Sequence, residues 1–309
     1  MVIRPIAGGV QVLAPAKLNL FLEVLGRRPD GYHELETLMV AIDLHDRLSF
    51  LADDSGRIAL ECDDPGLPTG PGNLVVKAAE RLRLEAGPDR SPTLGARIRL
   101  EKSIPSQAGL GGGSSDAAAT LVALDRLWGL DTPPGRLREL AGLIGSDVSF
   151  FLDAPAAVCR GRGERVEPLD SHPESSPPEF HAVLVCPSVG VRTPDVYAGL
   201  TPPDRPVPIG PAVDAFLSGD PARLGRCLHN RLQPVAERIQ PALGRVRSAL
   251  IDLTPSLDGH LMSGSGSAYF GLARDRQAAS DAASRLGDLG IGTIRVVRCA
   301  VPEPDTHPA

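Results

Sequence analysis

The sequence predicts an α+β protein of two domains. Strand patterns and helix patterns both occur along the chain without the regular alternation of a parallel α/β fold. The 309 residues exceed what one ordinary hydrophobic core accommodates. A stretch rich in serine, proline and histidine, residues 171–178, separates the two halves. We therefore expect an N-terminal domain over residues 1–170, a C-terminal domain over 171–302 and a mobile tail over 303–309.

The elements of the first half follow from hydrophobic periodicity and from residues that start or end helices. Strand patterns occupy residues 18–25, 47–51, 57–62 and 96–101. The last of these alternates most regularly, which predicts a half-buried strand leading into the segment after it. Asn73 is placed to cap a helix through Leu82, and a helix over 137–144 is closed by Gly145. Residues 156–169 contain a Gly-Arg-Gly-Glu turn signal and predict a hairpin.

The second half contains fewer strand patterns and more helix patterns. The strand patterns occupy residues 182–186, 268–272 and 294–301. Asp220 followed by Pro221 is a common helix start and predicts a helix toward Leu228. Apolar residues at helical spacing predict two more helices, over 243–250 and 278–289. A glycine-serine segment, residues 263–267, precedes one strand, and a flexible turn explains it as well as an anion site does.

Composition excludes several classes of function. The net charge of −6 argues against nucleic acid or an anionic membrane as the main partner. No apolar stretch approaches the ~20 residues of a membrane span. The five cysteines are widely separated and form no Cys-x-x-Cys pair, so we expect free thiols and a reducing, cytoplasmic location. The sequence leaves the oligomeric state open.

One segment carries the clearest chemical signal. Residues 104–119 read Ile-Pro-Ser-Gln-Ala-Gly-Leu-Gly-Gly-Gly-Ser-Ser-Asp-Ala-Ala-Ala. The glycines permit positive φ angles and a close approach of ligand to backbone, and Ser114, Ser115 or Asp116 can cap the following helix. Unpaired amides and the partial positive charge at a helix start suit a polyphosphate. The segment is neither a Walker A nor a Rossmann sequence, because both the lysine and the Gly-x-Gly-x-x-Gly spacing are missing.

Other residues are ambiguous one by one. Lys17 and Asn19 share one face of the first strand pattern, because side chains repeat every second residue, but a solvated face explains them equally well. Asp147 lies between a helix and an apolar run, where it is either a general base or a turn residue. Tyr32 and His33 follow a Pro-Asp-Gly turn and have the groups needed to stack on a nucleobase and hydrogen-bond to it.

Together these segments resemble the kinase superfamily named for galactokinase, homoserine kinase, mevalonate kinase and phosphomevalonate kinase. The Pro-x-x-x-Gly-Leu-Gly-Gly-Gly-Ser-Ser pattern at 105–115 is typical of the whole superfamily. A narrower combination comprises Pro-Ala-Lys-Leu-Asn-Leu at 15–20, Arg-Pro-Asp-Gly-Tyr-His at 28–33 and Gly-Ser-Asp-Val at 145–148. It resembles the branch whose acceptor is diphosphocytidyl methylerythritol, an intermediate of the non-mevalonate isoprenoid route.

The resemblance implies a fold and an activity. It implies an N-terminal domain like the second domain of ribosomal protein S5, a ferredoxin-like C-terminal domain and an active site in the cleft between them. It also implies transfer of the ATP γ-phosphoryl group to the 2-hydroxyl of that small-molecule acceptor, with Mg²⁺ as the metal. ATP is then a co-substrate, and neither nucleic acid nor a membrane is a partner.

Motif matching also implies roles for individual residues. Lys17 and Asp147 correspond to the catalytic pair of the family, and Ser115 is the candidate Mg²⁺ ligand. The segment that matches the ATP phosphate site comprises Pro105, Ser106, Gln107, Ala108, Gly109, Leu110, Gly111, Gly112, Gly113, Ser114 and Ser115. The residues that match substrate-binding positions are Asn19, Tyr32, His33, Thr193 and Tyr197.

The sequence departs from the family pattern at two places. Ser146 and Ser149 replace the usual alanine and proline near the acid, and residues 230–233 read Asn-Arg-Leu-Gln instead of Asn-Asp-Leu-Glu. Two alternatives therefore stand: another small-alcohol kinase, of the mevalonate or homoserine type, and a non-catalytic nucleotide-binding regulator. The retained Lys17 and Asp147 favour an enzyme, and the acidic composition disfavours an S5-like RNA-binding module.

Overall fold

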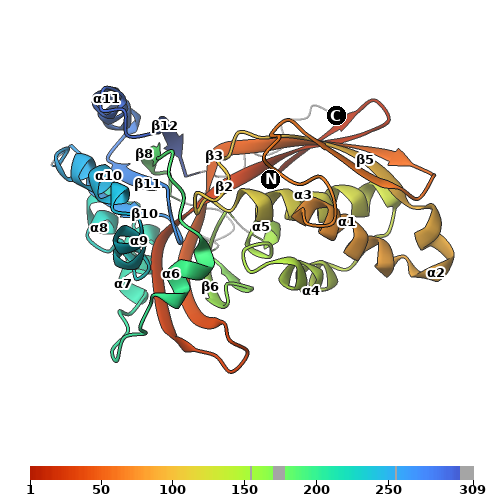
Figure 1. Ribbon diagram of the computed structural model, residues 1–309, viewed down its shortest axis with the longest axis horizontal. Helices are drawn as coiled ribbons and strands as arrows, with labels where there is room; N and C mark the ends of the chain where they lie inside the picture. Colours follow the sequence, from red (N-terminus) through yellow and green to blue (C-terminus); the bar gives the residue numbers. More distant parts are fainter. Residues whose placement is uncertain (154, 170–177, 255, 300–309) are drawn as a thin grey trace.

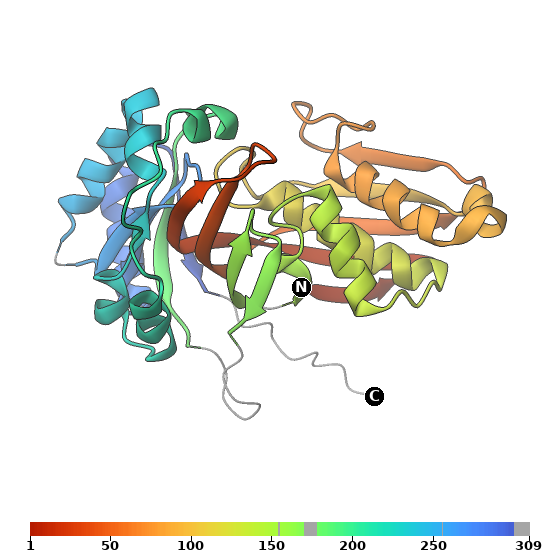
Figure 2. The same ribbon diagram turned by 90° about the horizontal axis from the view of Figure 1, so that it is seen from below.

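The computed structural model describes residues 1–153, 155–169, 178–254 and 256–299, and this part of the chain forms two sheets with helices packed on them (Figures 1 and 2). In Figure 1 the C-terminal sheet and its helices lie on the left and the N-terminal helices on the right. Two long strands, β2 (Gly9–Arg27) and β3 (His33–Asp53), run between them. The predicted α+β class and the two-domain organisation are confirmed.

The N-terminal sheet is built around the β2–β3 hairpin. Its other strands are β1 (Val2–Ile6), β4 (Ile58–Cys62), β5 (Gly95–Glu101), β6 (Ala156–Gly161) and β7 (Arg165–Pro168). The order is β1-β2-β3-β5-β4, with β6 on the first half of β3 and β7 on β6. The helical segments of this part are α1 (Leu74–Glu85), α2 (Gly87–Arg90), a 3₁₀ turn (Ser91–Thr93), α3 (Gly112–Trp128), α4 (Pro134–Ile144) and α5 (Phe150–Asp153). The α1, α3 and α4 helices cover one face of the sheet (Figure 2).

The C-terminal sheet has the expected ferredoxin-like topology. Its strands are β8 (His181–Cys186), β10 (Gly259–Met262), β11 (Tyr269–Ala273) and β12 (Thr293–Arg298), in the fully antiparallel order β10-β11-β8-β12. The helices are α6 (Thr193–Ala198), α7 (Gly210–Leu217), α8 (Pro221–Gly225), α9 (Gln233–Ile239), α10 (Ala242–Ile251) and α11 (Arg276–Gly287). A two-residue strand, β9 (His229–Asn230), leaves this half to pair with β2. None of the described helices is both long and apolar enough to cross a membrane.

The strand that the sequence predicts over 18–25 is part of the longer β2, which is buried on both faces. Every residue from 14 to 24 is buried, so both faces of β2 are covered. The pairing register shifts at three places, one of them between Asn19 and Phe21, where Leu20 is an extra residue. Such bulges redirect side chains next to functional sites. Here the bulge directly follows the two polar residues of the strand, Lys17 and Asn19.

Helix caps confirm some of the sequence predictions and correct others. The Asn73 side chain accepts a hydrogen bond from the Val75 amide, and Asp220 caps α8 in the same way. The predicted caps Ser114, Ser115 and Asp116 are wrong, because α3 begins earlier and the left-handed Gly111 is its N-cap. Gly145 ends α4 in an extended conformation and not in the left-handed one that a glycine cap usually adopts.

The predicted linker, apart from Pro178, and the predicted tail lie outside the described residues. The predicted domain boundary at residue 170 therefore stays a prediction.

A continuous apolar core joins the two domains. Leu18 and Leu38 of the long hairpin pack in one buried cluster with Phe180 and Phe270 of the C-terminal part. Separate clusters fill the space under the N-terminal helices and between the C-terminal sheet and its helices. Because the hairpin belongs to the shared core, side chains that point from it into the space between the domains have fixed positions.

A buried carboxylate adds a polar link between the domains. Glu23 on β2 is fully buried, and both of its oxygens accept hydrogen bonds from Arg231 at 2.7 Å. The Val24 amide and the Val207 amide also donate to it. Burial alone would raise the pKa of Glu23, but these donors outweigh it and lower the pKa to about 2. Arg231 lies at one of the positions where the sequence departs from the family pattern.

We expect the Glu23 pair to make stability depend on acid pH. A carboxyl with a depressed pKa stabilises the fold above its unfolded-state pKa, and this contribution is lost as the pH falls toward the folded-state value. Between pH ~6 and pH ~3 the wild-type protein should lose roughly 2 kcal/mol more unfolding free energy than Glu23→Gln. Urea unfolding of both proteins at the two pH values measures this, and identical losses would contradict it.

Candidate active site

A cleft of about 1170 Å³ lies between the glycine-rich segment, the tip of the β2–β3 hairpin and α6. Its lining includes every candidate residue from the sequence except Ser115, namely Lys17, Asn19, Tyr32, His33, residues 105–114, Asp147, Thr193 and Tyr197. The fold therefore brings together segments that are far apart in the chain. Lining the cleft does not by itself give a residue a role, so the contacts of each group decide what it can do.

The glycine-rich segment ends in a helix start with free amides. Gly109 and Gly111 have φ angles of 77° and 72°, which side-chain-bearing residues rarely adopt. The first hydrogen bond of α3 runs from the Ser115 amide to the Gly111 carbonyl at 2.9 Å. The amides at positions 112–114 thus have no acceptor within the helix and lie at the cleft wall. This arrangement suits the binding of phosphate oxygens.

Lys17 lies beneath this helix start with its ammonium group surrounded by acceptors. The residue is 3% exposed, and Nζ donates to the Asn19 Oδ1 atom and to the Gly109 carbonyl at 2.8 Å. The third neighbour is Asp147, whose Oδ2 atom is 3.6 Å from Nζ. Burial lowers the pKa of Lys17, and the negative charge of Asp147 partly offsets this effect. The structure therefore brings Lys17 of the first predicted strand next to Asp147, the acid that follows α4.

Asp147 lies on the turn between α4 and α5, where one third of its side chain is exposed. The β6–β7 turn packs next to it, because a Cβ atom on Gly163 would lie 3.4 Å from the Asp147 Oδ1 atom. Gly163 has a φ of 118°, so the close approach depends on glycine there. The acid therefore has one oxygen toward Lys17 and remains open to the cleft, which is the arrangement a proton acceptor requires.

A second glycine segment supports the first. The Ser263 hydroxyl donates to the Gly109 carbonyl at 3.0 Å, and a Cβ atom on Gly109 would lie 2.1 Å from the Ser263 carbonyl oxygen. Asn230 in turn donates to the Gly264 carbonyl at 2.8 Å. Residues 263–267 are therefore a structural support for the phosphate segment, a role that their sequence alone did not indicate.

Sequence reasoning missed a buried ionic cluster below the cleft. The Lys102 ammonium group contacts the carboxylates of Asp46 and Asp116, and all three side chains are at least nine-tenths buried. Asp46 also accepts from the amides of Ser103 and Ile104, the first residues of the loop. Burial and the charge of Asp46 raise the pKa of Asp116 above its ordinary value, although Lys102 opposes the shift. The cluster therefore holds both ends of the phosphate segment. The only sequence signal for this cluster is the position of Lys102 directly after β5.

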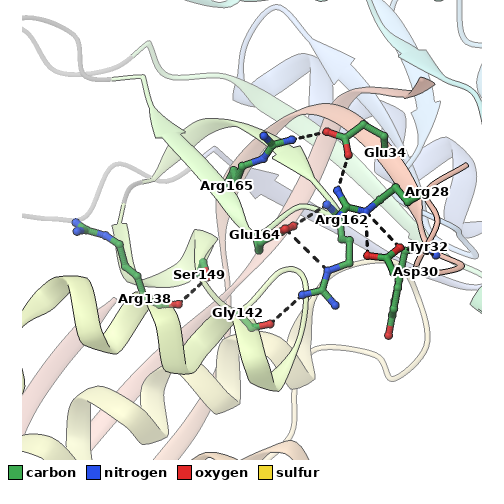
Figure 3. A network of polar contacts seen from close by, with 10 residues as sticks. All are labelled: Arg28, Asp30, Tyr32, Glu34, Arg138, Gly142, Ser149, Arg162, Glu164 and Arg165. Carbon is green, nitrogen blue, oxygen red and sulfur yellow. Dashed lines mark hydrogen bonds and ion pairs between the residues drawn. The ribbon is translucent and has the colours of Figure 1, made fainter. Parts of the chain in front are cut away.

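Aromatic side chains form the opposite end of the cleft. The rings of His33 and Tyr197 are stacked with centroids 5.2 Å apart. Burial and the positive charge of Arg27 lower the pKa of His33, which favours the neutral imidazole. Burial and the negative charge of Asp147 raise the pKa of Tyr197. Tyr32 is 53% exposed, and Arg162, which the sequence did not single out, lies over its ring (Figure 3).

Comparison with known proteins gives close relatives. Residues 73–161 match the model of the GHMP kinases N terminal domain, and residues 212–292 match that of the GHMP kinases C terminal domain. A protein of Pelotomaculum thermopropionicum named 4-diphosphocytidyl-2-C-methyl-D-erythritol kinase is 44% identical over 278 residues, covering 89% of this chain and 93% of its own. A protein of Salinibacter ruber with the same name is 42% identical and covers 88% and 93%.

Solved structures agree with these relatives. The crystal structure of a 4-(cytidine 5′-diphospho)-2C-methyl-D-erythritol kinase gives a TM-score of 0.74 at 40% identity and covers 93% of this chain and 98% of its own. The homoserine kinase of Cytophaga hutchinsonii gives a TM-score of 0.73 at 21% identity, covering 97% of each chain. The second likeness is one of fold alone.

Proposed function

This chain belongs to the family of 4-diphosphocytidyl-2-C-methyl-D-erythritol kinases, and from that premise we propose that it transfers the γ-phosphoryl group of ATP to the 2-hydroxyl of 4-diphosphocytidyl-2-C-methyl-D-erythritol. This reaction is a step of the non-mevalonate isoprenoid route. The observation that carries the proposal is the position of Lys17, 3.6 Å from Asp147 and hydrogen-bonded to the glycine segment within one cleft.

The glycine segment supplies the site for the ATP phosphates. Its free amides at 112–114 bind phosphate oxygens, and the N-terminal end of α3 adds a partial positive charge. Gly112 cannot take a larger side chain without a rearrangement, because a Cβ atom there would lie 3.0 Å from Ile104 and 3.3 Å from the Lys102 Nζ atom. The close packing keeps the amides in place, and positioning is the main requirement of phosphoryl transfer.

The donor groups beside the segment fit Mg²⁺. The Asp116 Oδ1 atom is buried without a hydrogen-bond partner among the described residues, and Asp116 and Ser114 both line the cleft. The Ser115 hydroxyl is also unpartnered but does not line the cleft, so we assign the metal to Asp116 and Ser114 instead. Carboxylate and hydroxyl oxygens are the ligands that Mg²⁺ prefers. Bound with ATP, the ion would neutralise charge on the phosphate oxygens.

In the proposed reaction Asp147 accepts a proton from the acceptor, and Lys17 compensates negative charge on the transferred phosphoryl group. Asp147 accepts the proton of the acceptor 2-hydroxyl as that oxygen forms its bond to the γ-phosphorus. The bond between the γ-phosphorus and the bridging oxygen breaks, and ADP leaves with the electron pair. Lys17 lies 3.6 Å from the Asp147 carboxylate and offsets negative charge near the transferred group. Asn19 fixes Lys17, because its amide group donates to Thr37 at 2.8 Å and therefore presents its oxygen to the ammonium group.

The aromatic end of the cleft is the proposed cytosine site. Tyr32 and Tyr197 provide ring faces, neutral His33 provides a donor and an acceptor, and Thr193 starts the helix that carries Tyr197. The Thr193 hydroxyl is 2.7 Å from that of Ser265, which ties this helix to the second glycine segment.

The five cysteines are free thiols, which supports a reducing, cytoplasmic location for the enzyme.

An ADP-release assay tests the function directly. The purified protein is incubated with ATP, Mg²⁺ and the cytidyl acceptor, and the 2-phosphate product is identified by mass spectrometry and phosphorus NMR. Mevalonate and homoserine serve as competing acceptors. We expect acceptor-dependent ADP release with the cytidyl compound alone. Turnover of mevalonate or homoserine instead would assign the protein to another small-alcohol kinase, and ATP binding without any turnover would indicate a regulator.

Replacing Tyr32 by alanine should weaken acceptor binding and leave ATP binding unchanged. Stacking of a base on an aromatic ring contributes ~1–3 kcal/mol, so the KM for the cytidyl acceptor should rise about tenfold or more. Steady-state kinetics with each substrate varied in turn measures both KM values. Tyr32→Phe keeps the ring and is the matched control. A rise in the KM for ATP alone would remove Tyr32 from the acceptor site.

A further inference from the structure

The Tyr32 ring has no buried surroundings to hold it. It lies at the tip of the β2–β3 hairpin, in a turn closed by a hydrogen bond from the Arg28 amide to the Tyr32 carbonyl at 2.8 Å. The Asp30 Oδ1 atom accepts from the Tyr32 amide at 3.1 Å, which fixes the backbone but not the ring. An exposed aromatic side chain samples several rotamers unless a neighbour restricts it. A ring that must receive a base therefore needs a contact from another element.

Arg162 provides this contact from the turn between β6 and β7. Its guanidinium carbon is 4.8 Å from the centre of the Tyr32 ring, within the range of a cation–π contact. Figure 3 shows the guanidinium group beside the ring, with one side of the ring facing Arg162. Both residues line the cleft. Arg162 therefore covers one face of the Tyr32 ring and leaves the other available for a ligand.

Arg162 is itself held by the N-terminal domain. Its Nη2 atom donates to the Gly142 carbonyl at the end of α4 at 3.2 Å, and its amide donates to Glu164 at 2.6 Å. The nearest carboxylate to the guanidinium group is Glu164, with 3.9 Å between Nε and Oε1. The Gly142 carbonyl and the Glu164 carboxylate thus hold the guanidinium group in the position from which it contacts the ring.

Further ion pairs fix the hairpin tip relative to the same turn. Arg28 pairs with Asp30 at 3.1 Å and with Glu34 at 2.6 Å, and Glu34 also contacts Arg165 of β7 (Figure 3). The tip that carries Tyr32 and the turn that carries Arg162 are therefore joined by a network separate from the cation–π contact. The network keeps the two side chains at a constant separation.

We propose that Arg162 is a positioning residue for the acceptor, because it orients the Tyr32 ring so that the uncovered face stacks on the cytosine base. The proposal rests on the proposed function and adds a determinant of base recognition to it. Arg162 acts through Tyr32 and not on the reacting atoms. Its removal should change acceptor binding and leave the chemical step unchanged.

Arg162→Gln is the primary test, with Arg138→Gln as the matched control. The control removes a nearby arginine whose ion-pair partner, Asp153, lies outside this network, at a position that does not line the cleft. For Arg162→Gln we expect a ~2–5-fold rise in the KM for the cytidyl acceptor, with kcat and the KM for ATP unchanged. Arg162→Lys keeps a cation without the planar group and should restore part of the loss. Unchanged acceptor KM in Arg162→Gln would overturn the proposal.

A double-variant cycle separates action through Tyr32 from direct contact with the acceptor diphosphate. If Arg162 acts through the ring, Arg162→Gln should have no further effect in the Tyr32→Ala background. If Arg162 binds the diphosphate directly, the two effects should multiply, and the proposal would be wrong. The cycle is read from the acceptor KM of all four proteins.

Calorimetric binding of two probes gives an answer that does not depend on turnover. Cytidine 5′-diphosphate carries the base, and inorganic pyrophosphate carries only the charges. Arg162→Gln should weaken binding of cytidine 5′-diphosphate ~2–5-fold and leave that of pyrophosphate unchanged. Equal weakening of both probes would overturn the proposal. If the wild-type protein binds cytidine 5′-diphosphate but does not phosphorylate the cytidyl acceptor, the proposed function fails while the Arg162 result still stands.

Discussion

Asp147→Asn should lower kcat by at least about a hundredfold while the KM for ATP stays unchanged. Asparagine has nearly the same shape but cannot take the proton of the acceptor hydroxyl, and a positioned base is typically worth ~10²–10⁴-fold in rate. Lys17 would also lose its 3.6 Å partner and carry an unbalanced charge next to the transferred group. Single-turnover kinetics with saturating ATP and acceptor measures the chemical step separately from product release.

Two controls make the Asp147 result specific. Asp147→Asn leaves the buried Lys17 without its anionic partner, so some stability is lost, and urea unfolding should show that the variant is still folded under the assay conditions. Calorimetric ATP binding should be unchanged, because the glycine segment does not depend on the carboxylate. A variant that turns over at nearly the wild-type rate would show that Asp147 is not the base.

Lys102→Met should have the largest effect on stability, lowering the unfolding free energy by roughly 3–5 kcal/mol. The change leaves the buried carboxylates of Asp46 and Asp116 next to each other without their shared cation. Urea unfolding at neutral pH measures the loss. Lys77→Met, which removes an exposed lysine from α1, is the matched control and should change the stability little.

A second variant tests the cause of this effect. Adding Asp116→Asn to Lys102→Met removes one of the two uncompensated charges, so the double variant should recover part of the lost stability. If Lys102→Met alone costs less than about 1 kcal/mol, the cluster is a weak contributor and the ends of the phosphate segment are held by other contacts.

The local signals of this sequence predicted many of the residues that line the cleft. The glycines before α3, the shared face of Lys17 and Asn19, and the acid after α4 are each readable from a few neighbouring residues. The strand order of the C-terminal domain came from the family resemblance. These features depend on local periodicity or on motifs, which a single sequence displays.

The parts that failed depend on contacts between distant segments. The sequence left open whether the strand face that carries Lys17 and Asn19 is solvated, and the structure buries both residues as well as Glu23. The register shift beside Asn19 arises from pairing with β3, and no local pattern encodes it. The serines of the phosphate segment look like helix caps in the sequence, but Gly111 starts the helix first because it can adopt a left-handed conformation. Likewise, Lys102 and Arg162 gain their roles only from partners many residues away.

The long β2–β3 hairpin has a consequence for which acceptors the enzyme accepts. Lys17 lies midway along β2, and Tyr32 lies at the hairpin tip, so one hairpin carries both the proposed base-binding ring and the lysine of the proposed phosphoryl-transfer site. An analogue with one phosphate fewer would reach one of these two residues at a time. If the proposed site is right, the enzyme should therefore discriminate between acceptors by their length as well as by their chemistry.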